Sequence, residues 1–359
     1  MESFQMAKDS TPLSLSQCYI LPEDKRPQLS KVSTLASIPI IDLSVDRINK
    51  HGPSQLLLDK ISQACEEYGF FQVINHGVPQ NLCKSMMTAV SDLFKLPPQE
   101  RSKFFSADHT KEARISNFYL KFQNQDKVTM WSENFRHPWD PNGDFVTLLP
   151  EKPPHYREVS VEYAKEINKL MEIIFGLISL SLGLEKNCLQ RKLGEKPRMK
   201  AQANFYPPCP DPELTLGLAV HTDLSALTVL MQSEEVNGLQ VIKDGKWVDV
   251  KPFPDAFVVN LGDQLQVLSN GRYKSVHHRA VTNKMLPRIS LAMFYGPNQN
   301  TWIGPIEELI DEEHPPLYRR YKFSEFLEEF ERQEGTRRRV KEAFEMPYVR
   351  SINSSSFTT

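Results

Sequence analysis

The chain has no paired cysteines, no long hydrophobic run and almost no net charge, and each lack excludes a class of protein. Its five cysteines are scattered and form no Cys-x-x-Cys pair, which predicts free thiols in a reducing compartment. With a formal net charge of −2, the chain has no excess of basic residues for nucleic acid or an anionic membrane. We therefore expect no nucleic acid and no membrane among its partners.

Hydrophobic runs are too short to cross a bilayer. The most apolar stretch, residues 173–184, covers about twelve residues, whereas a spanning helix takes roughly 20. The first residues are polar and lack the apolar region of a secretory signal, and the Ser-rich end at residues 354–359 carries no anchor motif. We expect a cytoplasmic protein that acts as a monomer.

The composition itself is that of a globular protein, since 40% of the 359 residues are hydrophobic and 25% are charged. This length is large for one domain but compatible with one core that carries appended helices. We expect an N-terminal arm, an N-terminal region, a long helix with its connection, a β-rich core, and a helical C-terminal segment with a tail, at residues 1–37, 38–155, 156–198, 199–300 and 301–359.

The first half of the chain alternates between helical patterns and short apolar runs. These predict three helices and two strands, at residues 54–68, 82–94 and 160–182 and at residues 38–43 and 70–74. Residues 104–155 are rich in aromatic side chains and show no sustained period, so an irregular stretch is expected there. It is either a lid or pocket wall, or a peripheral layer packed on the core.

From residue 200 onward the pattern changes to short strands separated by turn signals such as Asn237-Gly238. The candidate strands are residues 200–206, 215–221, 226–231, 238–242, 246–250, 256–260, 272–278 and 288–295. Such spacing predicts a barrel or a two-sheet jelly roll, so the expected fold class is mixed, with a β-rich core and surrounding helices. Helices are expected again at residues 323–332, with Ser324 as the N-cap, and at residues 337–345.

The triplet His221-Thr222-Asp223 stands at the end of one candidate strand. Side chains at i and i+2 share a face of a strand, so an imidazole and a carboxylate would aim at one point. They are two parts of a 2-His-1-carboxylate site, which suits non-haem Fe(II). The third ligand could be His277 or His278, because consecutive strand residues face opposite ways and spacing does not choose between them. An isolated His-x-Asp is also compatible with a polar strand end that holds no metal.

Two other candidate strands carry a second polar cluster. Arg288 and Ser290 share a face among apolar neighbours, where a planar guanidinium beside a hydroxyl is suited to bind a carboxylate. Asn204 and Tyr206 also share a face, and they offer an amide and a phenol. The alternatives are a surface charge for Arg288 and an ordinary amphipathic strand for the other pair.

These stretches, in this order, resemble the plant Fe(II)- and 2-oxoglutarate-dependent dioxygenases, which are isopenicillin N synthase-like. The resemblance runs from Ile38 to Phe330. It rests on these motifs: Gly69-Phe70-Phe71-Gln72-Val73-Ile74-Asn75-His76-Gly77-Val78, Asn204-Phe205-Tyr206-Pro207-Pro208-Cys209-Pro210, His221-Thr222-Asp223, Tyr273-Lys274-Ser275-Val276-His277-His278-Arg279 and Arg288-Ile289-Ser290.

The resemblance implies a double-stranded β-helix wrapped by helices, with Fe(II), 2-oxoglutarate and O2 as its reagents and ascorbate as the reductant in vitro. The family places its second iron histidine directly before an Arg, which selects His278. It implies that the iron ligands are His221, Asp223 and His278, that Arg288 and Ser290 hold the distal carboxylate of 2-oxoglutarate, that Tyr206 is a further donor to it, and that Asn204 lies near the chelating end.

Within the family, the chain most resembles the salicylate-hydroxylating, downy-mildew-susceptibility oxygenases, and flavonoid and tropane-alkaloid oxygenases are related. This implies hydroxylation, or another oxidation, of a small plant specialised metabolite that is phenolic, flavonoid or alkaloid, with release of succinate and CO2. By resemblance Phe294 lines the substrate pocket. The aromatic stretch supplies the other wall residues that we expect for a flat substrate: Phe118, Tyr119, Phe122 and Trp131.

Three other functions remain compatible with the motifs. An oxygenase of the 1-aminocyclopropane-1-carboxylate oxidase type uses the same triad without 2-oxoglutarate. A zinc hydrolase could use two His and an Asp, but it gives Arg288 and Ser290 no role. A non-enzymatic binding protein on the same fold would be expected to have lost a ligand first. Formation of succinate from 2-oxoglutarate separates the main prediction from all three.

Overall fold

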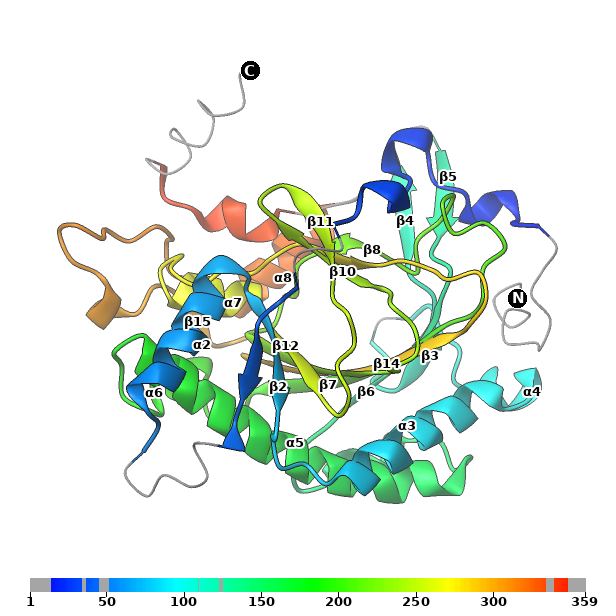
Figure 1. Ribbon diagram of the computed structural model, residues 1–359, viewed down its shortest axis with the longest axis horizontal. Helices are drawn as coiled ribbons and strands as arrows, with labels where there is room; N and C mark the ends of the chain where they lie inside the picture. Colours follow the sequence, from blue (N-terminus) through cyan, green and yellow to red (C-terminus); the bar gives the residue numbers. More distant parts are fainter. Residues whose placement is uncertain are drawn as a thin grey trace.

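The computed structural model describes residues 14–33, 37–44, 52–108, 110–122, 125–333 and 339–347, and two β-sheets face each other at its centre (Figure 1). The larger sheet, called the main sheet, has eight strands in the order β1-β2-β12-β9-β14-β7-β6-β3. The smaller sheet has four, in the order β11-β10-β13-β8. The bounds are β1 (Ile40–Asp42), β2 (Phe70–Ile74), β3 (Arg114–Ser116), β6 (Glu133–Pro138), β7 (Arg198–Tyr206), β8 (Leu218–His221), β9 (Leu227–Gln232), β10 (Leu239–Lys243), β11 (Lys246–Asp249), β12 (Phe257–Leu261), β13 (His278–Ala280) and β14 (Arg288–Gly296).

From β7 onward the chain alternates between the two sheets. Strands β7, β9, β12 and β14 lie in the main sheet, and the strands between them in sequence, β8, β10, β11 and β13, lie in the smaller one. The core pairs are antiparallel, with β14 between β7 and β9. This path is that of a jelly roll, so the predicted fold class is confirmed, and the described strands form two separate sheets rather than a closed barrel.

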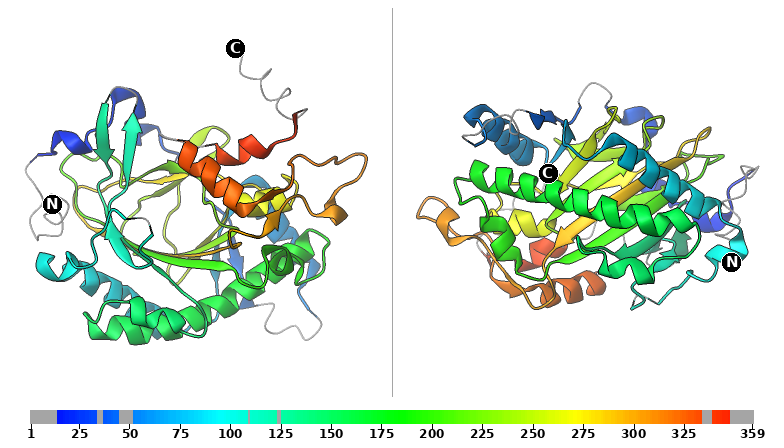
Figure 2. Two further views of the ribbon diagram at one scale, coloured as in Figure 1. Left: turned by 180° about the vertical axis from the view of Figure 1, so that it is seen from behind. Right: turned by 90° about the horizontal axis from the view of Figure 1, so that it is seen from below.

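Helices cover the outer face of the main sheet (Figure 2). Leu291 and Met293 of β14 point to that face and pack against them, whereas Ala292 packs with Val241 of the smaller sheet. The main sheet therefore has a helix-covered outer face and an inner face, defined as the face directed at the smaller sheet. The covering helices are α2 (Gln55–Glu67), α3 (Gln80–Lys95) and α5 (Pro154–Ser181).

Shorter elements flank the two sheets. They are α4 (Pro98–Arg101), α6 (Cys188–Leu193), α7 (Asp263–Leu268), α8 (Phe323–Arg332), the strand pairs β4–β5 (Tyr119–Phe122, Gln125–Thr129) and β15–β16 (Trp302–Ile303, Tyr321–Lys322), and the 3-10 helices η2 (Gln17–Tyr19), η3 (Glu23–Lys25), η4 (Leu29–Lys31), η5 (Asp144–Leu148), η6 (Glu307–Leu309) and η7 (Val340–Phe344). None of the helices that the structure describes combines the length and apolarity that a membrane crossing requires. The five cysteines are free thiols, as predicted.

The expected strand at residues 272–278 is wrong over most of its length, because β13 begins only at His278. The backbone N–H groups before it are bonded elsewhere. That of Lys274 donates to the carbonyl of Cys65, and that of Ser275 donates to the side chain of Gln266. A segment whose donors are already used in this way cannot join a sheet ladder.

The expectation of an irregular stretch at residues 104–155 is also wrong. Strands β6 and β3 extend the main sheet beyond β7, and β4 and β5 form a hairpin beside the N-terminal arm (Figure 1). The alternation of these strands is hard to recognise because buried polar residues, including Glu133 and Asn134, interrupt it. The hairpin also shifts register between Leu120 and Phe122.

At the C-terminal end, α8 coincides with the predicted helix, but its N-cap is Lys322 rather than Ser324. The backbone N–H of Lys322 donates to the Glu325 carboxylate at 2.9 Å, which places the N-cap two residues earlier than predicted. The second predicted helix, residues 337–345, is a 3-10 helix over its described part, η7, and its first two residues lie outside the described ranges. The arm predicted at residues 1–37 is described from residue 14 and contains three short 3-10 turns.

Candidate active site

Three predicted ligand residues meet between the two sheets. His221 ends β8 and lies opposite His278, which begins the neighbouring strand β13, so that the two ring centroids are 4.1 Å apart. Asp223 follows two residues after β8, and its Oδ1 lies 3.6 Å from Nε2 of His221 and 3.7 Å from Nε2 of His278. Among the described residues, this is the group of His, Cys, Asp and Glu side chains whose ligand atoms converge within 4.8 Å.

Hydrogen bonds behind the triad orient its two imidazoles. Nδ1 of His221 lies 2.8 Å from the carbonyl of Ala219, and Nδ1 of His278 lies 3.1 Å from that of Val276. Because a carbonyl only accepts, both rings carry their proton on Nδ1 and direct the lone pair of Nε2 at the shared point. This is the tautomer that a metal ion requires of each imidazole.

The carboxylate of Asp223 is held by its other oxygen. Oδ2 accepts hydrogen bonds from Thr228 Oγ1 at 2.6 Å and from Asn260 Nδ2 at 2.7 Å. These two donors, on β9 and β12, leave Oδ1 directed at the histidines. Motif spacing did not reveal Thr228 or Asn260, because they reach Asp223 through the pairing of strands rather than along the chain.

The charge states of His221 and Asp223 follow from their surroundings. Burial, together with repulsion from His278, lowers the pKa of His221 to about 4, so this imidazole is neutral at physiological pH. Burial by itself would raise the pKa of Asp223, but His278, His221 and its two hydrogen-bond donors lower it, so the carboxylate is ionised. Neutral imidazoles and an ionised carboxylate are the protonation states that bind a divalent metal. Two nitrogens and one oxygen converge, and this donor set fits Fe(II).

The structure distinguishes the two adjacent histidines. His277 precedes β13, and its carbonyl accepts from the backbone N–H of Ile242 in the smaller sheet. His278 alone of the two joins the converging group. The Phe70 ring packs against the His278 ring in a T-shaped arrangement, with centroids 5.1 Å apart, and covers it on that side.

The predicted carboxylate-binding residues lie on the inner face of the main sheet. Arg288 is paired with Tyr206 across β14 and β7, and Ser290 is paired with Asn204 and, on the other side, with Gln232 of β9. Asn204 Nδ2 donates to the Ser290 hydroxyl at 3.3 Å. The four predicted residues are thus brought together, on the face that also looks toward the triad.

Arg288 is a buried cation without a buried anion. It is 3% exposed, its Nη2 donates to Gln232 Oε1 at 2.7 Å, and its guanidinium lies 5.1 Å from the centre of the Tyr206 ring. No carboxylate of the described residues lies within 4 Å of it, and its buried Nε has no hydrogen-bond partner. Burial lowers its pKa. A buried guanidinium with spare donors fits the carboxylate of a bound molecule.

Two glycines let the smaller sheet approach this group. A Cβ at Gly238 would lie 2.6 Å from Cδ of Arg288, and a Cβ at Gly217 would lie 2.4 Å from Cδ1 of Tyr206. Any larger residue at these positions would displace the side chains of Arg288 and Tyr206. The sequence shows Gly238 only as part of an Asn-Gly turn signal, so this packing role could not be read from it.

The predicted substrate-pocket residues fall into two groups. Phe294 packs between the sheets on the inner face, opposite Thr228, and Phe118 and Phe122 pack in a cluster that includes Ala219 of β8. The structure does not bring the other two there. Tyr119 is 43% exposed, with the Lys127 ammonium 4.3 Å from its ring centre, and Trp131 is 2% exposed and packs edge-on against Tyr19 of the arm.

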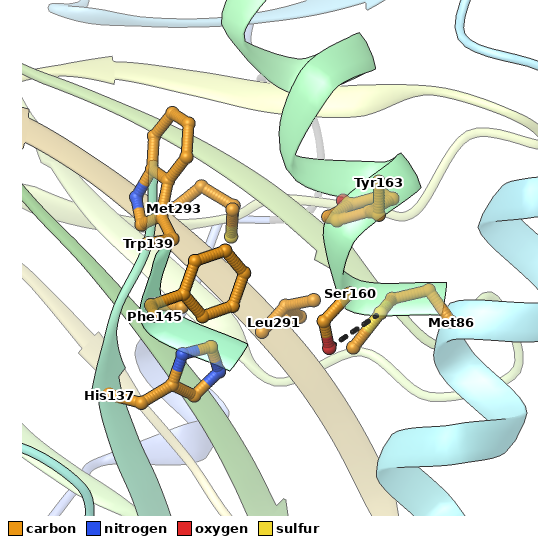
Figure 3. A pocket seen from close by; sticks show the side chains of 9 residues that line it. Met86, His137, Trp139, Phe145, Ser160, Tyr163, Leu291 and Met293 are labelled. Carbon is orange, nitrogen blue, oxygen red and sulfur yellow. Dashed lines mark hydrogen bonds between the residues drawn. The ribbon is translucent and has the colours of Figure 1, made fainter. Parts of the chain in front are cut away.

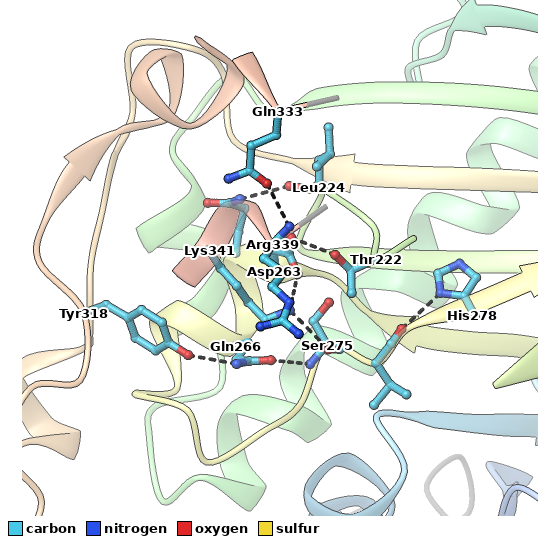
Figure 4. A network of polar contacts seen from close by, with 12 residues as sticks. Thr222, Leu224, Asp263, Gln266, Ser275, His278, Tyr318, Gln333, Arg339 and Lys341 are labelled. Atoms are coloured by element: carbon cyan, nitrogen blue, oxygen red, sulfur yellow. Dashed lines mark hydrogen bonds and ion pairs between the residues drawn. The ribbon is translucent and has the colours of Figure 1, made fainter. Parts of the chain in front are cut away.

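A polar network supports the triad from behind (Figure 4). Asp263, at the start of α7, accepts from Thr222 Oγ1 at 3.0 Å, and its backbone N–H donates to the carbonyl of Asp223 at 2.8 Å. Its other carboxylate oxygen is 3.0 Å from Nζ of Lys341, which comes from η7. Thr222, which lies between His221 and Asp223, is therefore tied to the C-terminal part of the chain.

A separate small cavity of about 10 Å³ lies on the outer face of the main sheet, between the sheet and helices α3 and α5 (Figure 3). Met86, His137 and Tyr163 are among its lining residues. It has room for roughly one water molecule. Burial lowers the pKa of His137 to about 4, and the ring is 3.1 Å from the Tyr156 hydroxyl, so this cavity is structural packing rather than part of the site.

Comparison with known proteins agrees with this geometry. A family model described as the 2OG-Fe(II) oxygenase superfamily matches residues 198–297, and the N-terminal model of the non-haem dioxygenases in morphine synthesis matches residues 38–158. DMR6-LIKE OXYGENASE 2 of Arabidopsis thaliana is 43% identical over 87% of this chain and 88% of its own length. Flavanone 3-dioxygenase 2 of Oryza sativa subsp. japonica is 41% identical over 87% of this chain and 89% of its own length.

A solved structure of JOX2 in complex with 2OG, Fe and JA superposes with a TM-score of 0.83, covering 96% of this chain and 97% of that one at 35% identity. The family, the reaction class and the cofactors predicted from the order of the motifs are thereby confirmed. The segment matched by the oxygenase model, residues 198–297, contains both the triad and the group of polar residues around Arg288. The chain therefore belongs to the 2OG-Fe(II) oxygenase superfamily and is a 2-oxoglutarate-dependent dioxygenase that works with Fe(II).

Proposed function

We propose that His221, Asp223 and His278 hold the iron of this enzyme, and that it oxidises a small plant specialised metabolite of phenolic, flavonoid or alkaloid type. One observation carries the assignment of the cosubstrate site. Arg288 is a buried guanidinium with no carboxylate of the described residues within 4 Å, on the face of the sheet that looks toward the triad. 2-Oxoglutarate supplies the missing anion.

Four side chains divide the work of holding 2-oxoglutarate. Arg288 pairs with its distal carboxylate, and the Ser290 hydroxyl donates to the same group. Burial raises the pKa of Tyr206, so its phenol keeps its proton and can donate a third hydrogen bond. Asn204, next to Ser290, lies toward the chelating end of the cosubstrate.

The bound iron supplies oxygen activation, which the enzyme couples to the conversion of 2-oxoglutarate and O2 into succinate and CO2. In hydroxylation, one oxygen atom enters succinate and the other enters a C–H bond of the substrate. The residues of this chain orient the reactants and exclude water. Phe70 shields His278, and Phe294 lies across from Thr228, which holds Asp223.

The similarity to known oxygenases supports a small aromatic or polycyclic substrate. By their names, relatives of this chain act on flavanone or remove a methyl group from codeine, and the latter, from Papaver somniferum, is 37% identical over 82% of this chain. Phe118, Phe122 and Phe294 could flank such a molecule. We propose these three as the aromatic walls.

The test is an assay of the purified protein with Fe(II), ascorbate, 2-oxoglutarate and a panel of phenolic, flavonoid and alkaloid compounds. We expect substrate-dependent succinate and a product heavier by one oxygen atom, or one that has lost hydrogen or a methyl group. Asp223→Ala is the background control, since it removes an iron ligand. If no compound raises succinate above that control, the proposed substrate class is wrong.

We also propose that the enzyme acts as a monomer in the cytosol. Five free thiols, of which Cys65, Cys188 and Cys209 are buried, are compatible with a reducing compartment. Light scattering after size-exclusion chromatography and the location of a fluorescent fusion test the two statements. A stable dimer would refute the first, and an exclusively organellar fusion would refute the second.

A further inference from the structure

Helix α7 lies directly against the segment that follows β8 and carries Asp223. At its N-terminal end, the backbone N–H of Asp263 donates to the carbonyl of Asp223 at 2.8 Å, and that of Gln264 donates to the carbonyl of Ser225 at 3.2 Å. A Cβ at Gly262 would overlap the carbonyl oxygen of Ser225, so this close approach requires a glycine. The first N–H groups of a helix have no partner within it, and here they hold the backbone of a proposed iron ligand.

The same helix holds the segment that leads into β13. The side-chain oxygen of Gln266 accepts from the backbone N–H of Ser275 at 2.7 Å. The carbonyl of the next residue, Val276, lies 3.1 Å from Nδ1 of His278 and orients its ring. Helix α7 therefore contacts both of the segments that supply the converging side chains.

Lys341 completes this connection from the C-terminal part of the chain (Figure 4). Its Nζ lies 3.0 Å from Oδ1 of Asp263 and 3.4 Å from the carbonyl oxygen of Ser275. The other carboxylate oxygen of Asp263 accepts from Thr222 of the His-x-Asp triplet. The side chains of the ion pair are 12% and 1% exposed, so salt and solvent screen their attraction little. One ammonium thus acts on both segments, directly at Ser275 and through Asp263 at Thr222.

The strand pairing that brings the two histidines together is irregular. Strands β8 and β13 pair His221 with His278 and Leu218 with Ala280, and the register shifts between these two pairs. A shift of this kind disrupts the ladder locally. The smaller sheet therefore fixes the separation of the two histidines less firmly than a regular ladder would, and contacts from outside the sheet contribute to it.

The C-terminal segment is anchored without the help of this ion pair. Tyr321 and Phe326 are fully buried, and their ring centroids lie 4.2 and 5.6 Å from that of the buried Phe344. The Tyr321 hydroxyl also donates to Gln264 of α7 at 2.9 Å. An aromatic cluster of this kind holds the segment through the apolar area that it buries. The ammonium of Lys341 is therefore brought to α7 by a segment that is attached independently of it.

We propose that Lys341 is a positioning residue for the iron site. By attracting Asp263 and the carbonyl of Ser275, its ammonium holds the two ligand segments, residues 221–223 and 275–278, at the separation that one metal ion requires. The proposal rests on the proposed function, since it takes the iron ligands assigned there as given. It extends the site to a residue from the far end of the described chain that contacts none of the ligand atoms.

The test makes three measurements on each variant: Fe(II) affinity by metal competition, the visible absorption spectrum of the protein loaded with Co(II) in place of Fe(II), and the melting temperature of the metal-free protein. In Lys341→Met we expect Fe(II) affinity to fall by about 10-fold, the lower end of the range for residues that orient metal ligands. The Co(II) spectrum should change as well, because its bands depend on the geometry of the ligands. Lys341→Arg keeps the charge and should restore part of both.

A double variant separates positioning from a role in stability alone. Lys341→Met leaves the Asp263 carboxylate buried without its cation, which lowers the melting temperature. Adding Asp263→Asn removes that charge and keeps an oxygen that accepts from Thr222, so the melting temperature should recover. The link to Lys341 stays broken, so Fe(II) affinity and the Co(II) spectrum should not recover. If both return to wild type together with the melting temperature, the inference is overturned.

The controls show which proposal has failed. Arg332→Gln removes an exposed cation, paired with Glu329 on α8, from the same C-terminal segment, and it should bind iron like the wild type. Should Lys341→Met not fold, the double variant still decides. Wild-type Fe(II) affinity and Co(II) spectrum in Lys341→Met would overturn the inference, and loss of iron binding in His278→Ala would then leave the proposed ligands standing. Wild-type iron affinity in His278→Ala would remove the proposed iron site itself.

Discussion

Replacing Arg288 should separate cosubstrate binding from iron binding. In Arg288→Ala the distal carboxylate of 2-oxoglutarate would remain buried beside Ser290 and Tyr206 without a positive charge. Arg288 is 3% exposed and no carboxylate of the described residues lies within 4 Å, so no protein anion has to be displaced when 2-oxoglutarate binds. Loss of one partner of such a buried pair costs roughly 2–5 kcal/mol, or about 30-fold to several thousandfold in affinity.

Milder variants at Arg288 and at two residues beside it should give smaller losses of affinity. Arg288→Lys should recover part of the affinity, because an ammonium keeps the charge but not the planar fork. Ser290→Ala should cost about 1 kcal/mol, the share of one neutral hydrogen bond. Gly238→Ala should also weaken binding, since its Cβ would lie 2.6 Å from Cδ of Arg288.

The assay is an anaerobic titration of 2-oxoglutarate into the Fe(II) protein, followed through the visible absorption band of the complex. Fe(II) affinity, measured separately, should stay within about threefold of wild type in all these variants, because none touches the triad or its hydrogen-bond donors. Wild-type affinity for 2-oxoglutarate in Arg288→Ala would refute the assignment of Arg288. A parallel loss of iron binding would show that the variant had disturbed the fold instead.

Three further predictions concern the triad. His278→Ala should abolish turnover while His277→Ala keeps substantial activity, with circular dichroism confirming that both fold; the reverse result would overturn the ligand assignment. Asn260→Ala and Thr228→Val should each weaken Fe(II) binding by about 10- to 100-fold, measured by metal competition, because each removes a donor to the Asp223 carboxylate; unchanged affinity would show that the donors are dispensable. The iron-free protein should lose stability as the pH falls from about 6.5 to about 4, because the His221 pKa is lowered to about 4 and the unfolded chain takes up that proton first. The measurement is the melting temperature across this pH window in the wild type and in His221→Phe, which lacks the titrating group. If the melting temperature of the wild type falls no more than that of His221→Phe, the lowered pKa is contradicted.

The features that could be predicted from the sequence are those that depend on local geometry. The i and i+2 spacing of His221 and Asp223 at a strand end, and of Arg288 and Ser290 within a strand, places each pair on one face whatever the rest of the chain does. Turn spacing, which is also local, predicted a barrel or a two-sheet jelly roll, and the resemblance to the oxygenases favoured the jelly roll. By contrast, local spacing could not choose between the adjacent histidines His277 and His278. The structure shows that β13 begins at His278.

Features that depend on which strands become neighbours could not be predicted. Thr228 and Asn260 contact Asp223 only because β9 and β12 lie side by side in the main sheet. Trp131, by contrast, was predicted as a wall of the substrate pocket, but it packs against Tyr19 of the N-terminal arm.

The ion pair between Lys341 and Asp263 has a consequence for the stage of synthesis at which the protein can bind iron. Asp263 is 1% exposed and holds Thr222, which lies between His221 and Asp223, but its cation comes from almost the end of the described chain. Folding of the core before Lys341 is available would bury this carboxylate without its cation, an arrangement that is strongly unfavourable. Iron loading should then wait until Lys341 has left the ribosome, and stalled nascent chains that end before and after this residue should differ in the iron they retain.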